Sequence, residues 1–319
     1  MFIIGSASMD IKLENIWKSW WNYRKGKNAG PQLEEFEYSL EGNLQALFED
    51  LAKGTYKHGS YRTFIVAENK RREISVAAIR DRIVHRILYD YLVPIFDHTF
   101  IFDAWSCRKT KGLLGAIERT QDFLKSFPNH YVWRADIRKF FDHVDQDVLL
   151  TLLKRRVTDP ATLLLLQEVI FSYPAGIPIG NLTSQIFANI YLNELDRFVT
   201  THLKSSAYLR YGDDFLVFDS DPLLLKQKRE QVEHFLKEKL KLTLHPTNDQ
   251  LLKAKQGLHF LGVRMYPSGR TLNDRAINRA ITRLNSQNLS SYWGLIAKHC
   301  NAKENKKFLW ETLSRMSII

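Results

Sequence analysis

The chain has 319 residues, of which 45% are hydrophobic, so a disordered chain is excluded and a core divided among two or three lobes is expected. The formal net charge of +11 favours a polyanionic partner, and it is uneven: residues 1–50 carry 5 basic and 8 acidic side chains, whereas residues 251–319 carry 12 and 3. The two cysteines form no CxxC pattern, which argues against a zinc site and a disulfide framework. No apolar run approaches the ~20 residues of a membrane span, and the N-terminus lacks the basic region of a signal peptide. We therefore expect a cytoplasmic protein.

Helices dominate the first part of the chain. Residues 10–25 place tryptophans at helical spacing, and residues 32–54 form a second predicted helix that ends near Gly54. The stretch YRTFIVAENKRREISV, residues 61–76, predicts two short strands joined by a basic turn. A helix over residues 77–96 follows, with arginines away from its apolar face.

Strands and helices alternate in the rest of the chain. The β-rich stretch HYVWRADI predicts a strand over residues 130–137, and Asp145 is the expected N-cap of the helix that follows. The later expected elements are a helix over 180–203, a hairpin over 208–218, a helix over 222–241, a strand over 257–265 and a basic helical tail from 272. This pattern indicates an α+β fold with strands clustered in the middle.

Two adjacent acids lie at the tip of the predicted hairpin YLRYGDDFLVF. Gly212 gives the turn its conformational freedom, and Asp213 and Asp214 follow between two apolar runs. A polar turn of this composition is common in proteins of every class, so the pair does not indicate a function by itself.

A third acid, Asp136, ends the strand over residues 130–137. A strand-end carboxylate and a hairpin-tip pair can converge if their strands are neighbours in one sheet. Oxygen-rich sites of this kind suit Mg²⁺, and two such ions about 4 Å apart can clamp the oxygens of a phosphoryl transfer. The cations would offset the repulsion between the carboxylates.

Several ordered motifs resemble those of bacterial reverse transcriptases. DIRKFF at Asp136 and YGDD at Asp213 look like motifs A and C of the right-hand polymerases. The stretches RREISVAAIRDRIVHRIL, FDAWSCRKTKG, GIPIGNLTSQIFANIYLNELD and HFLGVRM are similar, in this order, to two fingers motifs, motif B and motif E of that family. The resemblance runs from about residue 20 to residue 310.

The resemblance implies a right-hand polymerase fold with fingers, palm and a helical thumb. We expect an N-terminal helical extension over 1–60, fingers over 61–130, a palm over 131–270 with a motif B fingers segment near 160–185, and a thumb over 271–319. It further implies catalysis by Asp136, Asp213 and Asp214, with two Mg²⁺ ions held by these three residues and Ile137.

The resemblance also assigns residues that contact the nucleotide and the nucleic acid. Contacts to the incoming dNTP are expected from Lys70, Arg72, Phe141 and Gln185, and contacts to template and primer from Arg80, Arg82, Arg108, Lys111, Ile179, Gly180, Arg275 and Arg279. An aromatic at position 141 crowds a ribose 2′-OH, whereas viral RNA polymerases usually have an acid there, so Phe141 favours DNA synthesis. Solvated basic turns and core packing would account for the same residue types.

The family's lysine of motif D is missing. The stretch LTLHPTNDQLLKAK places Asn248 at its position, with His245, Lys253 and Lys255 nearby. The identity of a general acid is therefore open at the level of sequence.

Motif B separates the subgroups of bacterial reverse transcriptases. Retron and group II intron enzymes usually carry a glutamine before the glycine and a Ser-Pro later, whereas this chain has Ile179-Gly180 and Ser184-Gln185. That pattern resembles diversity-generating retroelements, in which a template-repeat RNA is copied with errors at adenines and a small basic accessory protein takes part. Two alternatives stay open: another bacterial reverse transcriptase, of retron, group II intron or phage-defence type, and a catalytically inactive nucleic-acid-binding palm.

Overall fold

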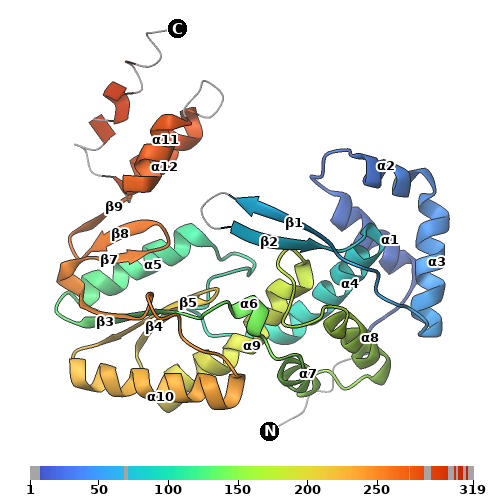
Figure 1. Cartoon of the computed structure of the whole chain (residues 1–319), viewed down its shortest axis with the longest axis horizontal. Coiled ribbons are helices and arrows are strands. Elements are labelled where there is room, and N and C mark those ends of the chain that lie inside the picture. Colours follow the sequence, from blue (N-terminus) through green and yellow to red (C-terminus); the bar gives the residue numbers. More distant parts are fainter. Residues whose placement is uncertain are drawn as a thin grey trace.

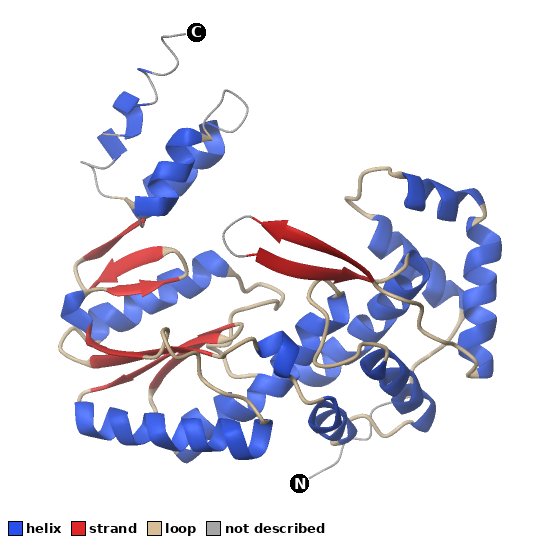
Figure 2. Cartoon of the chain, in the orientation of Figure 1, coloured by secondary structure: helices blue, strands red, loops and turns tan. Residues whose placement is uncertain are grey.

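The computed structural model describes residues 8–67, 71–272, 274–283, 289–300, 305–306, 308–311 and 314. The described strands gather in the middle of the molecule with helices on both sides of them, so the α+β prediction is confirmed (Figure 2). Among the described residues, no helix combines the length and the apolar character that a membrane crossing requires.

The N-terminal part consists of three helices, α1 (Leu13–Arg24), α2 (Pro31–Tyr38) and α3 (Leu40–Lys53). The prediction of one helix over residues 32–54 was wrong, because Ser39 leaves the helical conformation with φ −118° and ψ 37°. The side-chain amide of Asn43 donates to the carbonyl of Phe36 at 3.0 Å, which satisfies an acceptor that the break exposes. The predicted end is confirmed, since Gly54 adopts φ 68° at the C-cap.

A two-stranded antiparallel hairpin follows, made of β1 (Arg62–Ala67) and β2 (Arg71–Val76), as the sequence predicted. It projects between the N-terminal helices and the C-terminal part of the chain (Figure 1). The amide of Ser75 on β2 donates to the carbonyl of Ile179 at 3.0 Å, so the hairpin is attached to the segment that precedes helix α9 (Leu182–Arg197). Helix α4 (Ile79–Phe96) and the short turn η1 (Asp97–Thr99) complete this region.

The central sheet has four antiparallel strands in the order β4-β5-β3-β6. Their bounds are β3 (Tyr131–Asp136), β4 (Ala207–Tyr211), β5 (Asp214–Asp219) and β6 (Gln250–Lys253). Alternate residues of β5 enter different cores: Phe215 and Val217 face one, whereas Leu216 and Phe218 face the other. Both faces of the sheet are therefore covered, which explains the unbroken apolar run of this strand.

Helices α9 and α10 (Pro222–Leu240) belong to one side of the sheet, and helix α5 (Leu113–Ser126) packs against β4 and β8 (Val263–Tyr266) on the other (Figure 1). Asp145 caps helix α7 by accepting from the amide of Val148 at 2.9 Å, which confirms the predicted N-cap. The helices of this region are α5 (Leu113–Ser126), α6 (Phe140–His143), α7 (Gln146–Lys154), α8 (Pro160–Phe171), α9 (Leu182–Arg197), its π-helical extension η2 (Phe198–His202) and α10 (Pro222–Leu240).

The segment that was predicted as one strand over residues 257–265 is a hairpin. Leu261 and Gly262 have φ 51° and 82°, which makes a two-residue turn between the strands β7 and β8. The C-terminal elements are η3 (Ala254–Gln256), β7 (Leu258–Phe260), β8 (Val263–Tyr266), β9 (Gly269–Leu272), α11 (Asp274–Thr282) and α12 (Leu289–His299). The helical tail from about residue 272 is thus confirmed within the described residues.

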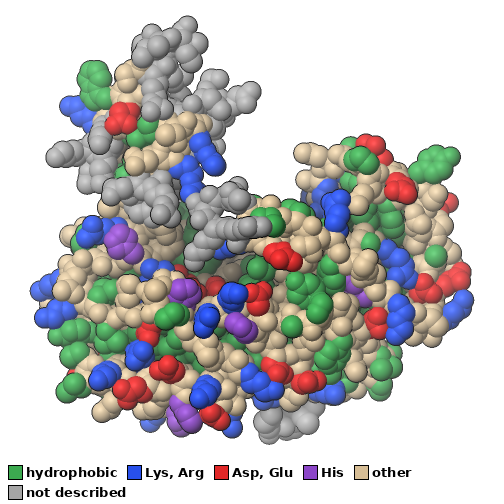
Figure 3. Space-filling view, in the orientation of Figure 1, with side chains coloured by type: hydrophobic (Ala, Val, Ile, Leu, Met, Phe, Trp, Pro, Cys, Tyr) green, Lys and Arg blue, Asp and Glu red, His purple; other side chains and the backbone are tan. Residues whose placement is uncertain are grey.

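The surface is deeply notched between the C-terminal helices and the N-terminal helices, with the β1–β2 hairpin between them (Figure 3). The central sheet lies below this notch (Figure 1). The proposed domain limits at residues 60, 130 and 270 stay a prediction. Helix α5 belongs to the predicted fingers by sequence, yet it packs on the central sheet.

Candidate active site

The sheet brings the three predicted carboxylates to one end. Strands β3 and β5 pair so that Asp136 lies opposite Asp214, and the turn between β4 and β5 consists of Gly212 and Asp213. Gly212 has φ +66°, which favours glycine. The amide of Ile137 donates to the carbonyl of Asp213 at 3.3 Å, so the turn is attached to the end of β3.

Asp214 is held by an arginine that the sequence analysis missed. Arg134 lies two residues before Asp136 on β3, and its Nε and Nη2 donate to the two carboxylate oxygens of Asp214 at 3.1 and 2.8 Å. Residues i and i+2 of a strand share a face, and that spacing was a usable signal. Asp214 is therefore balanced by a cation of the protein itself.

The carboxyl group of Asp213 has a pKa shifted above its ordinary value. Burial raises the pKa of Asp213 to about 6, and the negative charges of Asp136 and Asp214 act in the same direction. The positive charge of Arg72 opposes them, which places the predicted triphosphate-binding arginine within electrostatic reach of the site. A half-buried pair of carboxylates of this kind is stabilised by added positive charge.

Asn248 contacts a carboxylate of the site directly. Its side-chain amide donates to Oδ2 of Asp136 at 3.0 Å, and the amide of His245 donates to the carbonyl of Asp136 at 2.7 Å. The next residue, Asp249, accepts from Trp133 Nε1 at 2.7 Å and from Arg229 Nε at 2.8 Å, so the loop is anchored on both sides. Asn248 thus orients Asp136, and an amide cannot serve as a general acid at this position.

A metal ion would meet oxygen ligands here. Asp136 and Asp213 supply carboxylates, and Ile137, whose side chain is buried, offers only its main-chain oxygen. Within the described parts of the chain, no group of three His, Cys, Asp or Glu side chains is arranged to hold a metal ion. The bond from Arg134 to Asp214 is consistent with that result. The donor set nevertheless fits a hard divalent cation that keeps waters and binds phosphates.

The aromatic residue expected beside the sugar follows Asp136 on a short helix. Phe140 is buried and Phe141 is half-buried, with ring centroids 5.3 Å apart. The amide of Ile177 donates to the carbonyl of Phe141 at 2.8 Å. A Cβ on Gly176, which has φ +69°, would lie 2.2 Å from the same carbonyl oxygen, so only glycine allows this approach. Motif B therefore packs directly on the turn after Asp136.

For the other predicted nucleotide contacts, the structure gives at most their position and exposure. Gln185 is exposed on the first turn of α9, and Arg72 is exposed on β2. Lys70 lies outside the described residues.

Four predicted template contacts have partners within the protein. Arg80 forms an ion pair with Asp50 at 2.5 Å, and Arg82 donates to the carbonyl of Ala77 at 2.7 Å. Arg108 donates to Asp97 Oδ1 and to the carbonyls of Ile101 and Ala104 at 2.8, 2.8 and 3.0 Å, and Lys111 donates to the carbonyl of Phe102 at 2.9 Å. Each of the four therefore has a partner within the protein, and contact of these residues with the template stays a prediction.

The remaining predicted template contacts lie in motif B and in the C-terminal helices. Gly180 is exposed with φ +118°, and a Cβ there would lie 2.9 Å from Ile74 Cγ2. Ile179 is half-buried, and its carbonyl accepts from the fingers hairpin. Arg279 is half-buried on α11, and the side chain of Arg275 lies outside the described residues.

The sequence matches the family described as reverse transcriptase (RNA-dependent DNA polymerase) over residues 56–265, about two thirds of the chain. Protein YkfC of Escherichia coli is 25% identical over 273 residues, which cover 71% of this chain and 72% of YkfC. The group II intron-encoded protein LtrA of Lactococcus lactis is 23% identical over 173 residues, which cover 50% of this chain and 28% of LtrA.

Solved polymerase structures have a similar fold. Telomerase from Candida albicans superposes with a TM-score of 0.52 at 11% identity, covering 84% of this chain and 57% of the telomerase chain. The Sicinivirus 3Dpol RNA-dependent RNA polymerase gives a TM-score of 0.54 at 16% identity, covering 84% and 65%. The right-hand polymerase fold with its mixed sheets and helices is confirmed by these similarities.

Proposed function

Because this chain belongs to the reverse transcriptase family and is an RNA-directed DNA polymerase, we propose that it extends a primer on an RNA template at the end of the central sheet, between Asp136 and Asp213. The observation that carries this proposal is the register of β3 and β5. This register places Asp136, at the end of motif A, beside the YGDD turn, so that the carboxylates of Asp136 and Asp213 lie at the same end of the sheet. The raised pKa of Asp213 fits a site that is completed by cations.

Mg²⁺ is the proposed cofactor, with two ions in the site. The two ions would be held by Asp136, Asp213 and the main-chain oxygen of Ile137, and Asp214 would lie beside these ligands. In such a site the ions neutralise phosphate charge and align the attacking and leaving oxygens.

The chain's own residues prepare this geometry. Asn248 fixes one oxygen of Asp136, and Arg134 fixes Asp214. Arg72, which reaches the site electrostatically, is proposed to bind the triphosphate of the incoming dNTP, with Lys70 assisting. Phe141 is proposed to crowd the 2′-position and so to select deoxyribonucleotides.

The finer proposal is that the enzyme acts in a diversity-generating retroelement and makes errors at template adenines. Ile179 and Gln185 support it, since an apolar residue replaces a hydrogen-bonding one before Gly180 and the helix start keeps an N–H where relatives have proline. We infer a looser hold on the nascent pair, so that selection depends more on the base pair itself. Gly180, Arg275 and Arg279 would contact template and primer.

The proposed partners are the template-repeat RNA, the cDNA and a small basic accessory protein in a cytoplasmic complex. The excess of acidic side chains in residues 1–50 supplies charge that is complementary to such a protein.

The test is to sequence cDNA made by the purified enzyme on one mixed-sequence RNA. We expect misincorporation opposite adenine to exceed misincorporation opposite the other three bases, and Ile179→Gln to reduce the excess. Ile179→Leu, which keeps an apolar side chain and the same backbone bond to Ser75, is the matched control. An error rate that is equal across the four template bases would remove the subtype and leave the polymerase.

A second candidate is a role like that of group II intron-encoded proteins. It is favoured by LtrA, the relative that carries this description, although the chain spans only 28% of that protein. Sequencing the RNA that copurifies with the enzyme separates the two: a structured intron supports this candidate, and a repeat with adenine-directed variation supports the first. Absence of any RNA-templated extension would favour an inactive palm.

A further inference from the structure

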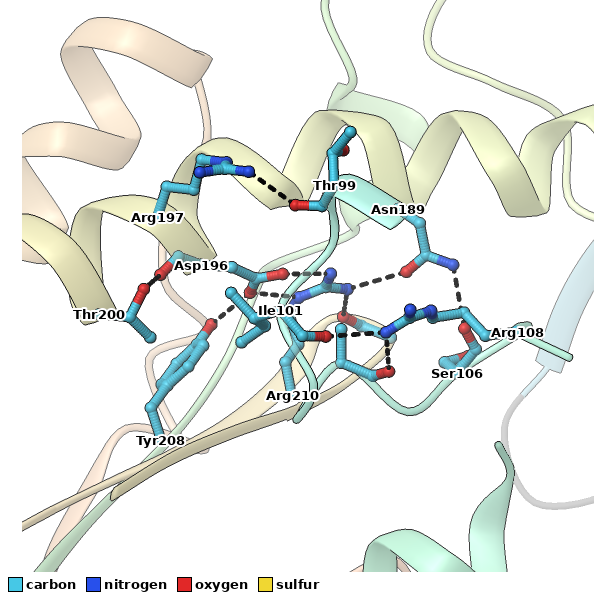
Figure 4. A network of polar contacts seen from close by, with 12 residues as sticks. Thr99, Ile101, Ser106, Arg108, Asn189, Asp196, Arg197, Thr200, Tyr208 and Arg210 are labelled. Atoms are coloured by element: carbon cyan, nitrogen blue, oxygen red, sulfur yellow. Dashed lines mark hydrogen bonds and ion pairs between the residues drawn. The ribbon is translucent and has the colours of Figure 1, made fainter. Parts of the chain in front are cut away.

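An ion pair is fully buried behind the YGDD turn. Arg210 on β4 donates through Nε and Nη2 to the two oxygens of Asp196 on α9, each at 2.7 Å (Figure 4). The side chains are 1% and 0% exposed, and the hydroxyl of Tyr208 donates to Asp196 Oδ1 at 2.8 Å. Replacing a buried ion pair with apolar residues is often neutral or stabilising, so stability alone does not explain such a pair.

The third nitrogen of the same guanidinium reaches the catalytic turn. Nη1 of Arg210 donates to the carbonyl of Gly212 at 3.0 Å and to Oδ1 of Asn189 at 3.3 Å. The Gly212 carbonyl belongs to the peptide that joins Gly212 to Asp213. The bond therefore fixes the orientation of this peptide plane, which glycine alone would leave free.

The backbone of Arg210 and the side chain of Asn189 attach a loop to the same place. The amide of Arg210 donates to the carbonyl of Asp103, and the amide of Trp105 donates to the carbonyl of Arg210, both at 2.9 Å. Asn189 Nδ2 donates to the carbonyl of Ser106 at 2.9 Å (Figure 4). A Cβ on Gly212 would lie 3.9 Å from the hydroxyl of Ser106, so this loop borders the turn itself.

We propose that Arg210 is a positioning residue, which fixes the Gly212–Asp213 peptide and thereby holds the carboxylate of Asp213 in place against Asp136. The part of Asp196 is to neutralise and orient the guanidinium. Arg210 acts through the turn and touches no reacting group. This inference rests on the proposed catalytic function of Asp213.

Arg210→Lys is the sharpest single change. A lysine ammonium keeps the charge and can reach Asp196, but it lacks the planar fork that serves both carboxylate oxygens and the Gly212 carbonyl together. We expect kcat for single-nucleotide addition to fall about 10- to 100-fold, because catalytic groups displaced by a fraction of an ångström lose rate on this scale. The Kd for template–primer should stay unchanged, and the Mg²⁺ concentration for half-maximal rate should rise.

A triple variant separates positioning from stability. The variant replaces the charged cluster with apolar groups by combining Arg210→Met, Asp196→Leu and Tyr208→Phe. Tyr208→Phe is included because Asp196→Leu removes the acceptor of the buried Tyr208 hydroxyl. The main-chain carbonyl of Asp196, which accepts from Thr200 at 2.7 Å, is not altered (Figure 4). We expect this variant to fold, as judged by thermal unfolding and template–primer binding, and to show the same loss of kcat as Arg210→Lys.

The matched control is another ion pair of the same sheet. Lys228 on α10 pairs with Asp219 on β5 at 2.8 Å, with side chains 9% and 13% exposed, at the end of β5 away from the turn. Lys228→Met with Asp219→Asn should change the unfolding temperature and keep kcat.

Three outcomes would overturn the inference. If Arg210→Lys keeps the kcat and the Mg²⁺ dependence of the wild type while Asp213→Asn is inactive, the inference fails and the proposed function survives. This conclusion does not depend on whether the triple variant folds. If the triple variant folds and has the wild-type kcat, the Arg210–Asp196 ion pair contributes only to stability and the inference fails. If Asp213→Asn remains active, the proposed function fails and the inference falls with it.

Discussion

Protonation of one buried histidine should make the stability of the enzyme depend on pH. His85 on α4 is 2% exposed; its Nδ1 lies 2.5 Å from the hydroxyl of Thr183 on α9, and its Nε2 lies 3.1 Å from Nε2 of His58. Burial lowers the pKa of His85 to about 3, and the charges of His58 and Arg82 act in the same direction. The ring is therefore neutral in the folded chain at every pH at which the enzyme is handled.

The direction and the magnitude of this pH dependence follow from the pKa values of His85 in the folded and the unfolded chain. An unfolded histidine titrates near 6.5, so the unfolded chain takes up a proton that the folded chain excludes between pH 6.5 and pH 3. Stability from this source is complete above pH 6.5 and is lost as the pH falls toward 3. Between pH 7.5 and pH 5 the loss amounts to about 2 kcal/mol.

The assay is the free energy of unfolding by urea at pH 7.5 and pH 5, for the wild type and for His85→Asn, whose amide retains a polar group near Thr183. Asp213 and Glu168, whose pKa values are shifted in the folded chain, are common to both proteins and cancel in the comparison. The variant should be less stable at pH 7.5 and should lose about 2 kcal/mol less than the wild type on acidification.

His234→Asn, on an exposed face of α10, is the control and should follow the wild type. Identical pH dependence of the wild type and His85→Asn would mean that His85 takes up its proton equally in the folded and the unfolded chain.

Three further predictions concern substrate handling. Phe141→Ala should lower the ratio of kcat/KM for dNTP over rNTP by about 10- to 100-fold, and an unchanged ratio would leave Phe141 as a packing residue. Asn248→Leu removes the bond to Asp136 and should reduce kcat about tenfold in single-nucleotide addition with template–primer Kd unchanged; a wild-type kcat would show that the bond is dispensable. Replacing Arg275, Arg279 and Arg283 by glutamine should flatten the dependence of log Kd on log salt by about 2 to 3, given 0.7 to 0.9 per phosphate, and an identical slope would mean that these arginines do not bind phosphates.

The sequence was sufficient where local pattern and burial agree. The hairpin at Gly212, the long helix after Gly180 and the capping of α7 by Asp145 all follow from turn chemistry and periodicity, and they are present in the structure. Which of the adjacent rings Phe140 and Phe141 is buried did not follow from the pattern: Phe140 is in the core and Phe141 packs partly buried against it.

Contacts between distant segments could not be predicted in this way. The bond from Asn248 to Asp136 joins residues 112 positions apart, and the bond from Arg134 to Asp214 joins residues 80 apart. The bond from Arg108 to Asp97 likewise depends on how the surrounding loop folds back on itself. Buried arginines such as Arg210 are recognised only when their partners are known, because sequence favours an exposed position for them.

Asp213 and Asp136 form the proposed site of RNA-templated DNA synthesis. The most direct measurement is extension of a labelled DNA primer on an RNA template with dNTPs and Mg²⁺, by the wild type and by Asp213→Asn, with template–primer binding measured in parallel. We predict cDNA from the wild type and a loss of rate of about a thousandfold or more in the variant, with binding intact, since a metal ligand contributes several kcal/mol to the transition state. Extension by Asp213→Asn at the wild-type rate would show that Asp213 is not a catalytic residue.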